Sequence, residues 1–303
     1  MLLATLPPIY REDLLEEVIA HPKVGAVRYN TGIRHDLPAR KILREILKLT
    51  ERHKKPPCIP DLKGRQLRVT EWSQPPYGPI RLNHRIEVEL PAKVYFRNDD
   101  PGLIKEIDGN EIYVDPPPKY TVGAGQSVNI VAPDLKIMDG YFLERDVEFI
   151  MAAKELGLDH FLFSFTEFKE DLELFDSVLS EYGINDAKKF LKIESQNGMD
   201  LVRDLAELPA GFNLMAARDD LTIHLGGIGA TGASREIVRK DPEAICASRL
   251  LLGLEQCGEV TLADISDIGY MQSFGYKNFM LSDGISHRHF RKAMEFWTEY
   301  IES

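Results

Sequence analysis

The sequence has few cysteines and few basic residues, and each shortage excludes a class of protein. Three cysteines occur, Cys58, Cys246 and Cys257, at no metal-ligand spacing, which argues against zinc sites and structural disulfides. Acidic residues outnumber basic ones by 48 to 37, and no stripe rich in lysine and arginine is present. Because binding to a phosphate backbone needs a positive face, no nucleic-acid partner is expected.

Long apolar runs are also missing. Stretches such as Phe279-Met280-Leu281 fall far short of the roughly 18 residues that span a bilayer. The start, Met1-Leu2-Leu3-Ala4, does not combine a basic segment with a long apolar one, as a secretory signal would. We therefore expect no membrane or export role and predict a cytoplasmic protein.

The chain does contain a regular alternation of apolar runs and segments with helical periodicity. With 303 residues, 44% of them hydrophobic, it is long enough for one large domain or two smaller ones. Strands are expected at residues 1–6, 24–29, 58–59, 160–165, 190–194, 212–217, 260–263 and 278–281. Helices are expected at residues 12–20, 37–53, 145–156, 169–182, 241–257, 264–274 and 287–301.

Alternating strands and helices favour a parallel sheet with right-handed crossovers. Eight such units predict an α/β protein with a closed (β/α)8 TIM barrel, and the alternative is a doubly wound open sheet. Residues 69–134 interrupt the alternation: they are rich in proline and glycine and have β-type runs at 86–90, 94–96, 111–114 and 128–131. We interpret them as a small β-rich lid domain inserted after strand three of a barrel formed by residues 1–68 and 135–303. The alternative is an insertion without a catalytic part.

Charged residues follow several of the expected strands. Lys192 and Glu194 end one of them, and Arg218, Asp219 and Asp220 end the next. In a barrel, the carboxyl ends of the strands form the active-site face. Two carboxylates and a lysine at one rim suggest a divalent-cation site beside an acid/base group. The alternative is a salt-bridged strand end followed by the start of a helix. Other charged residues expected at this face are Arg28, Asp61, Lys63, Asp264 and Asp283.

The order of these short motifs resembles the pyruvate kinase family of the phosphoenolpyruvate/pyruvate barrel superfamily. The resemblance rests on Lys192-Ile193-Glu194 with Gly198, on Ala217-Arg218-Asp219-Asp220-Leu221, on Val27-Arg28-Tyr29-Asn30 and on the segment from Asp61 to Arg68. It covers almost the whole chain, but no counterpart of the regulatory C-terminal domain is expected, so control through such a domain is not expected either.

The resemblance implies a role for each matching residue. Glu194 and Asp220 resemble the Mg²⁺ ligands, and Lys192 resembles the lysine that stabilises the enolate. Because an enolate is too basic to form at neutral pH, a cation and an ammonium must oppose its charge. Arg28 and Arg68 resemble the arginines that grip phosphate, for which a planar guanidinium is suited. The residues expected to contact the substrate, or the monovalent-cation and nucleotide side, are Asn30, Asp61, Lys63, Arg218, Asp219 and Asp264.

The sequence departs from the family pattern on the nucleotide side. Asn30 is followed by Thr31-Gly32, so the family's serine at the potassium site and its histidine are missing, and Leu62 replaces a threonine. Mg²⁺ is therefore expected and K⁺ is doubtful. Asp219 replaces a glycine beside the anion-binding turn. The catalytic threonine is replaced by Asp264, or by Ser248 if the helix expected there is wrong.

Two further interpretations follow. The glycine-rich stretch at residues 226–232 lacks a Gly-Lys-Ser/Thr ending, so we expect a flexible loop over the barrel mouth instead of a phosphate loop. For function, the favoured prediction is a pyruvate kinase-like enzyme that moves a phosphoryl group between phosphoenolpyruvate and a nucleotide. The alternatives are a Mg²⁺-dependent aldolase, lyase or decarboxylase acting on a 2-oxo acid, and a non-catalytic binding protein. A homo-oligomer is possible in each case.

Overall fold

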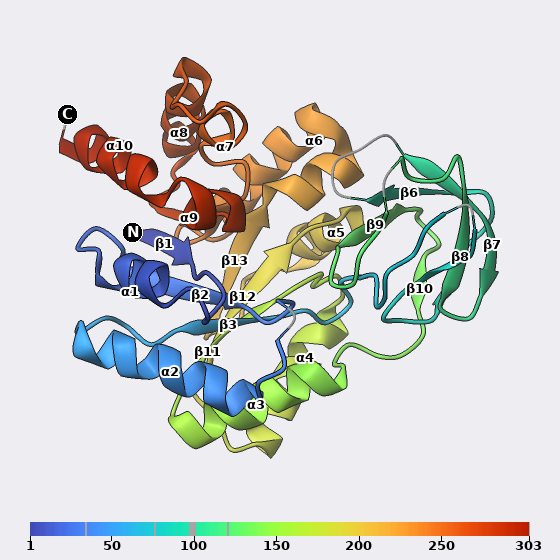
Figure 1. Ribbon diagram of the computed structural model, residues 1–303, viewed down its shortest axis with the longest axis horizontal. Coiled ribbons are helices and arrows are strands. Elements are labelled where there is room, and N and C mark those ends of the chain that lie inside the picture. The colour runs from blue at the N-terminus through green and yellow to red at the C-terminus, as the bar shows by residue number, and fades with distance from the viewer. Residues whose placement is uncertain (34, 76, 97–100, 120, 303) are drawn as a thin grey trace.

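The chain forms a closed barrel of eight parallel strands, as predicted (Figure 1). The computed structural model describes residues 1–33, 35–75, 77–96, 101–119 and 121–302. The barrel strands are β1 (Leu2–Thr5), β2 (Ala26–Asn30), β3 (Ile59–Leu62), β11 (His160–Phe163), β12 (Lys188–Ile193), β13 (Phe212–Ala217), β14 (Ile245–Ala247) and β15 (Asn278–Leu281). They close because β1 pairs with both β2 and β15. A closed sheet of this kind has no free strand edges.

Apolar side chains fill the barrel interior, and each contributing strand supplies one or two of them. Its members are Leu3, Ala26, Ile59, Leu162, Met215, Ile245, Ala247 and Met280. Residues on the opposite side of each strand face the surrounding helices, because side chains alternate along a strand. The interior is therefore packed, and a ligand must bind at one end of the barrel.

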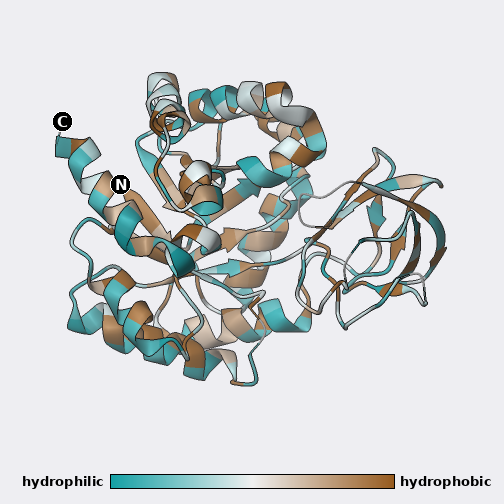
Figure 2. Ribbon diagram, turned by 45° about the horizontal axis from the view of Figure 1, so that its top comes forward, coloured by the Kyte–Doolittle hydropathy of each residue, from teal (hydrophilic) through white to brown (hydrophobic). Residues whose placement is uncertain are grey.

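The helices cover the outside of the barrel. They are α1 (Glu12–Ala20), α2 (Ala39–Arg52), α3 (Glu144–Leu156), α4 (Lys169–Glu181), α5 (Gln196–Asp204), α6 (Arg218–Lys240), α7 (Leu252–Cys257), α8 (Leu262–Phe274), α9 (Asp283–Arg288) and α10 (Phe290–Glu302). Figure 2 shows many of them with alternating polar and apolar bands. In α2, for example, Ile42, Leu43 and Ile46 are fully buried at helical spacing. None of the described helices is both long and apolar enough to cross a bilayer.

The seventh barrel strand does not lie where the sequence predicted it. The strand expected at 260–263 and the helix expected at 241–257 were wrong: the strand is β14, and 262–274 form α8. Three buried residues are too few to show a period, so β14 looked like part of a helix. Thr261 and Asp264 form a capping box, in which each side chain accepts a hydrogen bond from the other residue's backbone N–H. That Thr-x-x-Asp pattern is a helix-start signal that the sequence did contain.

The glycine-rich stretch at 226–232 was predicted to be a loop, and this was wrong: it is part of α6. Gly226 alone leaves the helical conformation, with φ 70° and ψ 168°. Glycine adopts positive φ without steric strain, so the helix is kinked there and continues.

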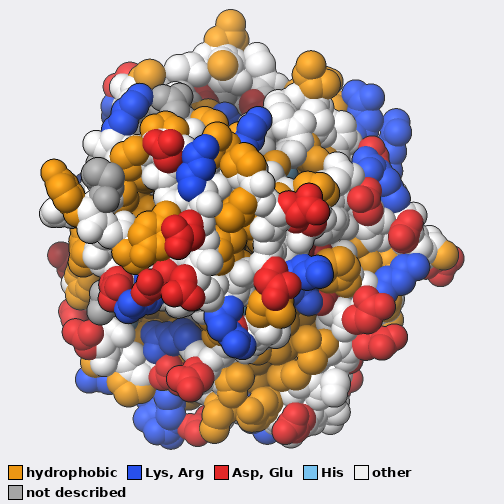
Figure 3. Space-filling model, turned by 90° about the vertical axis from the view of Figure 1, so that its right-hand side faces the viewer, with side chains coloured by type: hydrophobic (Ala, Val, Ile, Leu, Met, Phe, Trp, Pro, Cys, Tyr) orange, Lys and Arg blue, Asp and Glu red, His pale blue; other side chains and the backbone are white. Residues whose placement is uncertain are grey.

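The insertion forms a separate sheet beside the barrel (Figure 1). Its strands are β4 (Ile80–Arg81), β8 (Glu111–Asp115), β7 (Gly102–Asp108), β6 (Ala92–Phe96) and β9 (Val128–Val131), and β5 (Ile86–Glu87) pairs with β10 (Lys136–Ile137). It has its own apolar core, which includes Val94, Ile104 and Ile130. Figure 3, viewed from this side, shows acidic and basic side chains interspersed, with no large face of one sign.

Candidate active site at the mouth of the barrel

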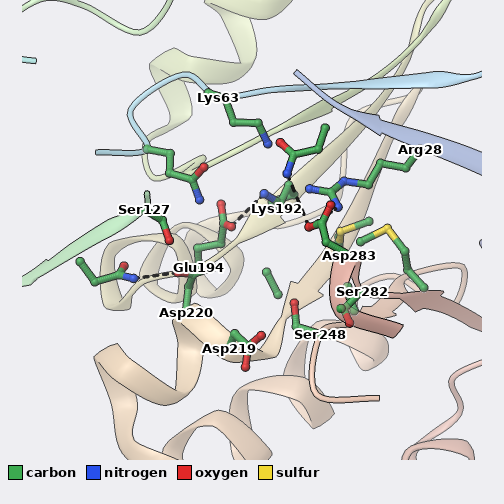
Figure 4. A pocket seen from close by; sticks show the side chains of 18 of the residues that line it. Arg28, Lys63, Ser127, Lys192, Glu194, Asp219, Asp220, Ser248, Ser282 and Asp283 are labelled. Carbon is green, nitrogen blue, oxygen red and sulfur yellow. Dashed lines mark hydrogen bonds and ion pairs between the residues drawn. The ribbon is translucent and has the colours of Figure 1, made fainter. Parts of the chain in front are cut away.

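A cavity of about 500 Å³ lies at the carboxyl ends of the barrel strands, where the inserted sheet meets the barrel (Figure 4). It is lined by Arg28, Asn30, Lys63, Gln66, Arg68, Ser127, Asn129, Lys192, Glu194, Met215, Ala217, Asp219, Asp220, Ile223, Ala247, Ser248, Glu255, Met280, Ser282, Asp283 and Gly284. Most of the residues expected at this face are among them. The cavity is strongly polar, as a site for a charged ligand must be.

Lys192 and Glu194 lie at the end of β12 and point the same way, because they are two residues apart on an extended chain. Nζ of Lys192 is 2.9 Å from Oε1 of Glu194 and donates a hydrogen bond of 2.8 Å to Oγ of Ser164. Burial by itself would lower the pKa of Lys192, but Asp61 and Glu194 outweigh it and the net shift is upward. The lysine is therefore a buried, permanently charged ammonium at neutral pH.

Glu194, which is buried, and Asp220, which is half-buried, form a pair of carboxyl groups beside this ammonium (Figure 4). Burial raises the pKa of Glu194 to about 7; Lys192 opposes the shift and Asp220 adds to it. Burial raises the pKa of Asp220 as well. Although Oε1 of Glu194 is an ion-pair neighbour of Lys192, it accepts no well-angled hydrogen bond from the described residues.

Two adjacent carboxyl groups fit a hard divalent cation, which prefers oxygen ligands and favours their ionised forms. Within the described residues, no three His, Cys, Asp or Glu side chains converge to hold a metal. The pair would therefore supply two ligands, and a substrate and water would supply the rest. This is how Mg²⁺ is usually held in proteins.

Arg28, which lines the cavity, forms a second charged cluster with the buried Asp61. Asp61 is fully buried and accepts hydrogen bonds from Arg28, from Nζ of Lys63 at 2.7 Å and from Oγ of Ser164 at 3.2 Å. Asp61 does not line the cavity, so its predicted contact with substrate is not supported; its position is that of a counterion to the cations around it. Burial lowers the pKa of Lys63 to about 7, although Asp61 opposes the shift.

The other arginine of the cavity, Arg68, comes from the segment that leads into the inserted sheet. It donates to Oε1 of Gln66 from Nε at 3.0 Å and from a second nitrogen at 2.6 Å. It also donates to the carbonyl oxygen of Gly125 at 2.5 Å. No described carboxylate lies within ion-pair distance of its guanidinium. Arg68 is therefore the arginine with charge available to an anionic ligand.

Two of the predicted site residues point elsewhere. Arg218 makes a bidentate ion pair with Asp267 at 2.7 and 2.8 Å and does not line the cavity. Asp264 accepts hydrogen bonds from the backbone N–H groups of Gly253 and Leu254, at 2.8 and 3.1 Å, besides capping α8. The prediction that Asp264 follows a barrel strand and reaches the site was wrong, since it lies in the first turn of that helix.

The alternative match, Ser248, is the residue that the structure places in the cavity. It follows β14 directly, and Figure 4 shows it beside Asp219 and Ser282. Ser248, Arg249 and Leu251 all have positive φ, between 57° and 62°. Such conformations cost about 1 to 3 kcal/mol each in non-glycine residues and are concentrated at functional sites. The strained loop holds a hydroxyl at the mouth of the barrel.

Asn129 is a site residue that the sequence gave no reason to select. It lies on β9 of the inserted sheet, and its Nδ2 donates a hydrogen bond of 2.9 Å to Oδ1 of Asp220. Its Oδ1 is 3.2 Å from Nε2 of His224, on α6. An asparagine in a β-type run has no special sequence signal, so only the packing of the inserted sheet against the barrel reveals it.

Comparisons with known proteins agree with the predicted family. No family model matches the chain. It is 22% identical over 284 residues to a pyruvate kinase from Borreliella burgdorferi, covering 86% of this chain and 58% of that protein. It is 26% identical over 177 residues to one from Clostridium perfringens, covering 56% and 36%. A third, from Lactobacillus delbrueckii subsp. bulgaricus, is 25% identical over 165 residues, covering 53% and 27%. The chain thus spans between about a quarter and three fifths of the length of these relatives, and the similarity is that of a divergent pyruvate kinase-like family.

Proposed function

We propose that this divergent pyruvate kinase-like chain is a Mg²⁺-dependent enzyme that binds a 2-oxo acid and stabilises its enolate at the mouth of the barrel. The main support is one arrangement: the buried ammonium of Lys192 lies 2.9 Å from Glu194, which is paired with Asp220. An enolate needs a positive charge that is already in position before the reaction starts, and Lys192 provides it.

The two carboxylates would hold the metal. When bound by Glu194 and Asp220, Mg²⁺ supplies a Lewis acid for the oxygen atoms of an oxo acid. Asn129 orients Asp220 through its hydrogen bond, and the backbone N–H of Phe165 orients Glu194 at 2.6 Å. Such supporting contacts fix the position of a ligand group.

The hydroxyl of Ser248 is the group that we assign to proton transfer at the carbon next to the oxo group. It lies in the same cavity as Lys192 and is held there by a strained loop. Lys192 would stabilise the oxyanion, and the Ser248 hydroxyl would donate its proton to the carbon and regain one from solvent; in the reverse direction the proton from carbon would pass through the hydroxyl to solvent. Asp219, which lines the same rim, is 3.5 Å from Arg249, so its charge is partly compensated.

Phosphoryl transfer to or from a nucleotide is the second candidate, and two observations favour it. Arg68 has charge available to an anion, and a further cavity of about 440 Å³ continues past it along the inserted sheet. That cavity shares Asn30, Arg68, Ser127 and Asp283 with the first. We do not include a K⁺ site, because Asp61 already has Arg28, Lys63 and Ser164 as partners.

The test is a calorimetric titration of oxalate, a stable mimic of the pyruvate enolate, with and without Mg²⁺. Binding should require Mg²⁺ and should be lost in Glu194→Gln, which keeps the size of the side chain but removes its charge. Glu181→Gln, an exposed residue at the end of α4, is the matched control and should bind as the unmodified protein does. An absence of Mg²⁺-dependent binding would contradict the proposal. Binding without any exchange of pyruvate methyl protons would instead indicate the non-catalytic alternative.

A further inference from the structure

The guanidinium of Arg28, which the family resemblance assigns to phosphate, is almost fully occupied by side chains of the protein itself. Its Nε donates to Oδ2 of Asp61 at 2.8 Å, and one terminal nitrogen donates to the same oxygen. The other terminal nitrogen donates to Oγ1 of Thr5 at 2.9 Å and to Oδ2 of Asp283 at 3.5 Å. Four of the five N–H bonds of a guanidinium therefore have acceptors. A bidentate grip on a phosphoryl group needs two free ones.

The cations at this end of the cavity already have carboxylate partners. Arg28, Lys63 and, at 3.6 Å, Lys192 lie around Asp61, and Arg28 also faces Asp283; burial lowers the pKa of Lys63 to about 7, so its ammonium is only partly charged at neutral pH. Burial raises the pKa of Asp283, but Arg28 outweighs it and the net shift is downward, so the carboxylate is ionised at neutral pH. A phosphoryl group placed here would add negative charge beside the ionised carboxylate of Asp283, and like charges at such close range repel each other.

Asp283 is moreover accessible to a ligand and has unused hydrogen-bonding capacity. Its side chain is 43% exposed and lines the main cavity (Figure 4). It also lines the adjoining cavity. Oδ1 is buried and accepts no hydrogen bond from the described residues, so the oxygen open to a ligand is Oδ2, which accepts only two long hydrogen bonds, of 3.5 Å each, from Arg28 and from Nδ2 of Asn30. A carboxylate with a free acceptor selects a ligand that carries a hydrogen-bond donor.

Arg68 does not restore a phosphate site by itself. Three of its N–H bonds go to Gln66 and to the carbonyl oxygen of Gly125. The remaining two suffice for one carboxylate, such as that of an oxo acid, but a phosphoryl group would have to bind without help from Arg28.

We propose that Asp283 determines the substrate class of the site: a 2-oxo acid that carries a hydroxyl or amino group at the Arg28 end, in preference to one that carries a phosphoryl group. This inference rests on the proposed function, because it assumes that the oxo-acid part is bound at Lys192 and the Glu194–Asp220 pair. It favours enolate chemistry without phosphoryl transfer.

The first test compares phosphoenolpyruvate with oxalate by calorimetry in the presence of Mg²⁺. In the unmodified protein, phosphoenolpyruvate should bind at least about tenfold more weakly than oxalate. In Asp283→Asn, the ratio of the phosphoenolpyruvate affinity to the oxalate affinity should rise about tenfold, because one negative charge is removed next to Arg28. Glu181→Gln is the control: it removes a charge from an exposed position at the end of α4, away from the cavity, so the ratio should not change.

The second test concerns the hydrogen-bond donor. 3-Hydroxypyruvate should compete with oxalate more strongly than pyruvate does, and Asp283→Ala should abolish the difference. Melting temperatures of Asp283→Asn and Asp283→Ala show whether these variants are folded. If neither is folded, the relative affinities of the four ligands for the unmodified protein test the inference. Phosphoenolpyruvate binding as tightly as oxalate, or no advantage of 3-hydroxypyruvate, would overturn this inference alone. A loss of Mg²⁺-dependent oxalate binding would instead refute the proposed function.

Discussion

Asn129 of the inserted sheet donates a hydrogen bond of 2.9 Å to Asp220 of the barrel, so a side chain of the insertion touches a proposed metal ligand directly. The amide is oriented by His224, whose Nε2 lies 3.2 Å from its oxygen. Burial lowers the pKa of His224 to about 4, so the imidazole is neutral at physiological pH and can donate to that oxygen. The amide hydrogens of Asn129 are then left for the carboxylate.

We expect Asn129→Ala to loosen the contact between the inserted sheet and the barrel. The loss of one hydrogen bond to a charged group should speed amide hydrogen exchange in β9 by roughly tenfold, which corresponds to about 1.5 kcal/mol. Exchange measured by mass spectrometry on peptides that cover β9 checks this. Asn185→Ala, at an exposed position where the side chain only accepts from Ser180, is the control. Equal exchange in both variants would mean that Asn129 does not hold the sheet.

We expect Lys192→Met to remove the ability to stabilise an enolate. Met has a similar length but no charge, so oxalate affinity and the exchange of pyruvate methyl protons with solvent should each fall by about 10² to 10³. Asp61 keeps Arg28 and Lys63 as partners, so the variant should remain folded. Proton exchange followed by NMR in heavy water provides the measurement, and exchange that persists in Lys192→Met would exclude this role.

We expect the hydroxyl at position 248 to matter more than the identity of the residue. Ser248→Ala should slow proton exchange by about 10², whereas Ser248→Thr should retain most of it because the hydroxyl is kept. Binding of oxalate should be similar in both variants, which separates proton transfer from binding. A fall of equal size in the two variants would indicate that the strained loop has been disturbed and that no proton-transfer role exists.

Glu167 gives a pH-dependent prediction at a residue that is not itself a proposed metal ligand, although Glu194 adds to its pKa shift. Burial raises the pKa of Glu167 from its ordinary value of 4.5 to about 7, although Ser195 donates a hydrogen bond to it. A carboxyl group whose pKa is higher in the folded state contributes stability at low pH, and this is lost as the pH rises through about 7.

Glu167→Gln has no such titration. The difference in the free energy of unfolding between the variant and the unmodified protein should therefore shift in favour of the variant from about pH 5 to pH 8. Thermal or urea unfolding should show a shift on the order of 1 to 2 kcal/mol, after allowance for the partial exposure of the side chain. Glu181→Gln, on the exposed end of α4, should show no such change. If the difference between Glu167→Gln and the unmodified protein were the same at both pH values, the raised pKa would be refuted.

The sequence by itself determined the barrel and most of its elements. Alternating apolar runs and helical periods require strands that bury both faces and helices that bury one, and only a parallel sheet with crossovers satisfies both. Segments with a clear period were predicted most accurately: α1 (Glu12–Ala20) and β13 (Phe212–Ala217) have the predicted bounds. The site residues Lys192, Glu194 and Asp220 also followed, because charges at the carboxyl ends of parallel strands converge at one face.

Only the tertiary structure decided which other side chains reach the cavity and which charged groups pair with one another. The three-residue strand β14 carries no period of its own, so only its pairing with β13 and β15 brings Ser248 to the cavity and leaves Asp264 as a helix cap. The pairing of Arg28 with Asp61 and Asp283 joins residues up to 255 positions apart. Whether an arginine is free for a ligand depends on which acceptors the folded chain places around its N–H groups, and no local pattern in the sequence contains that information.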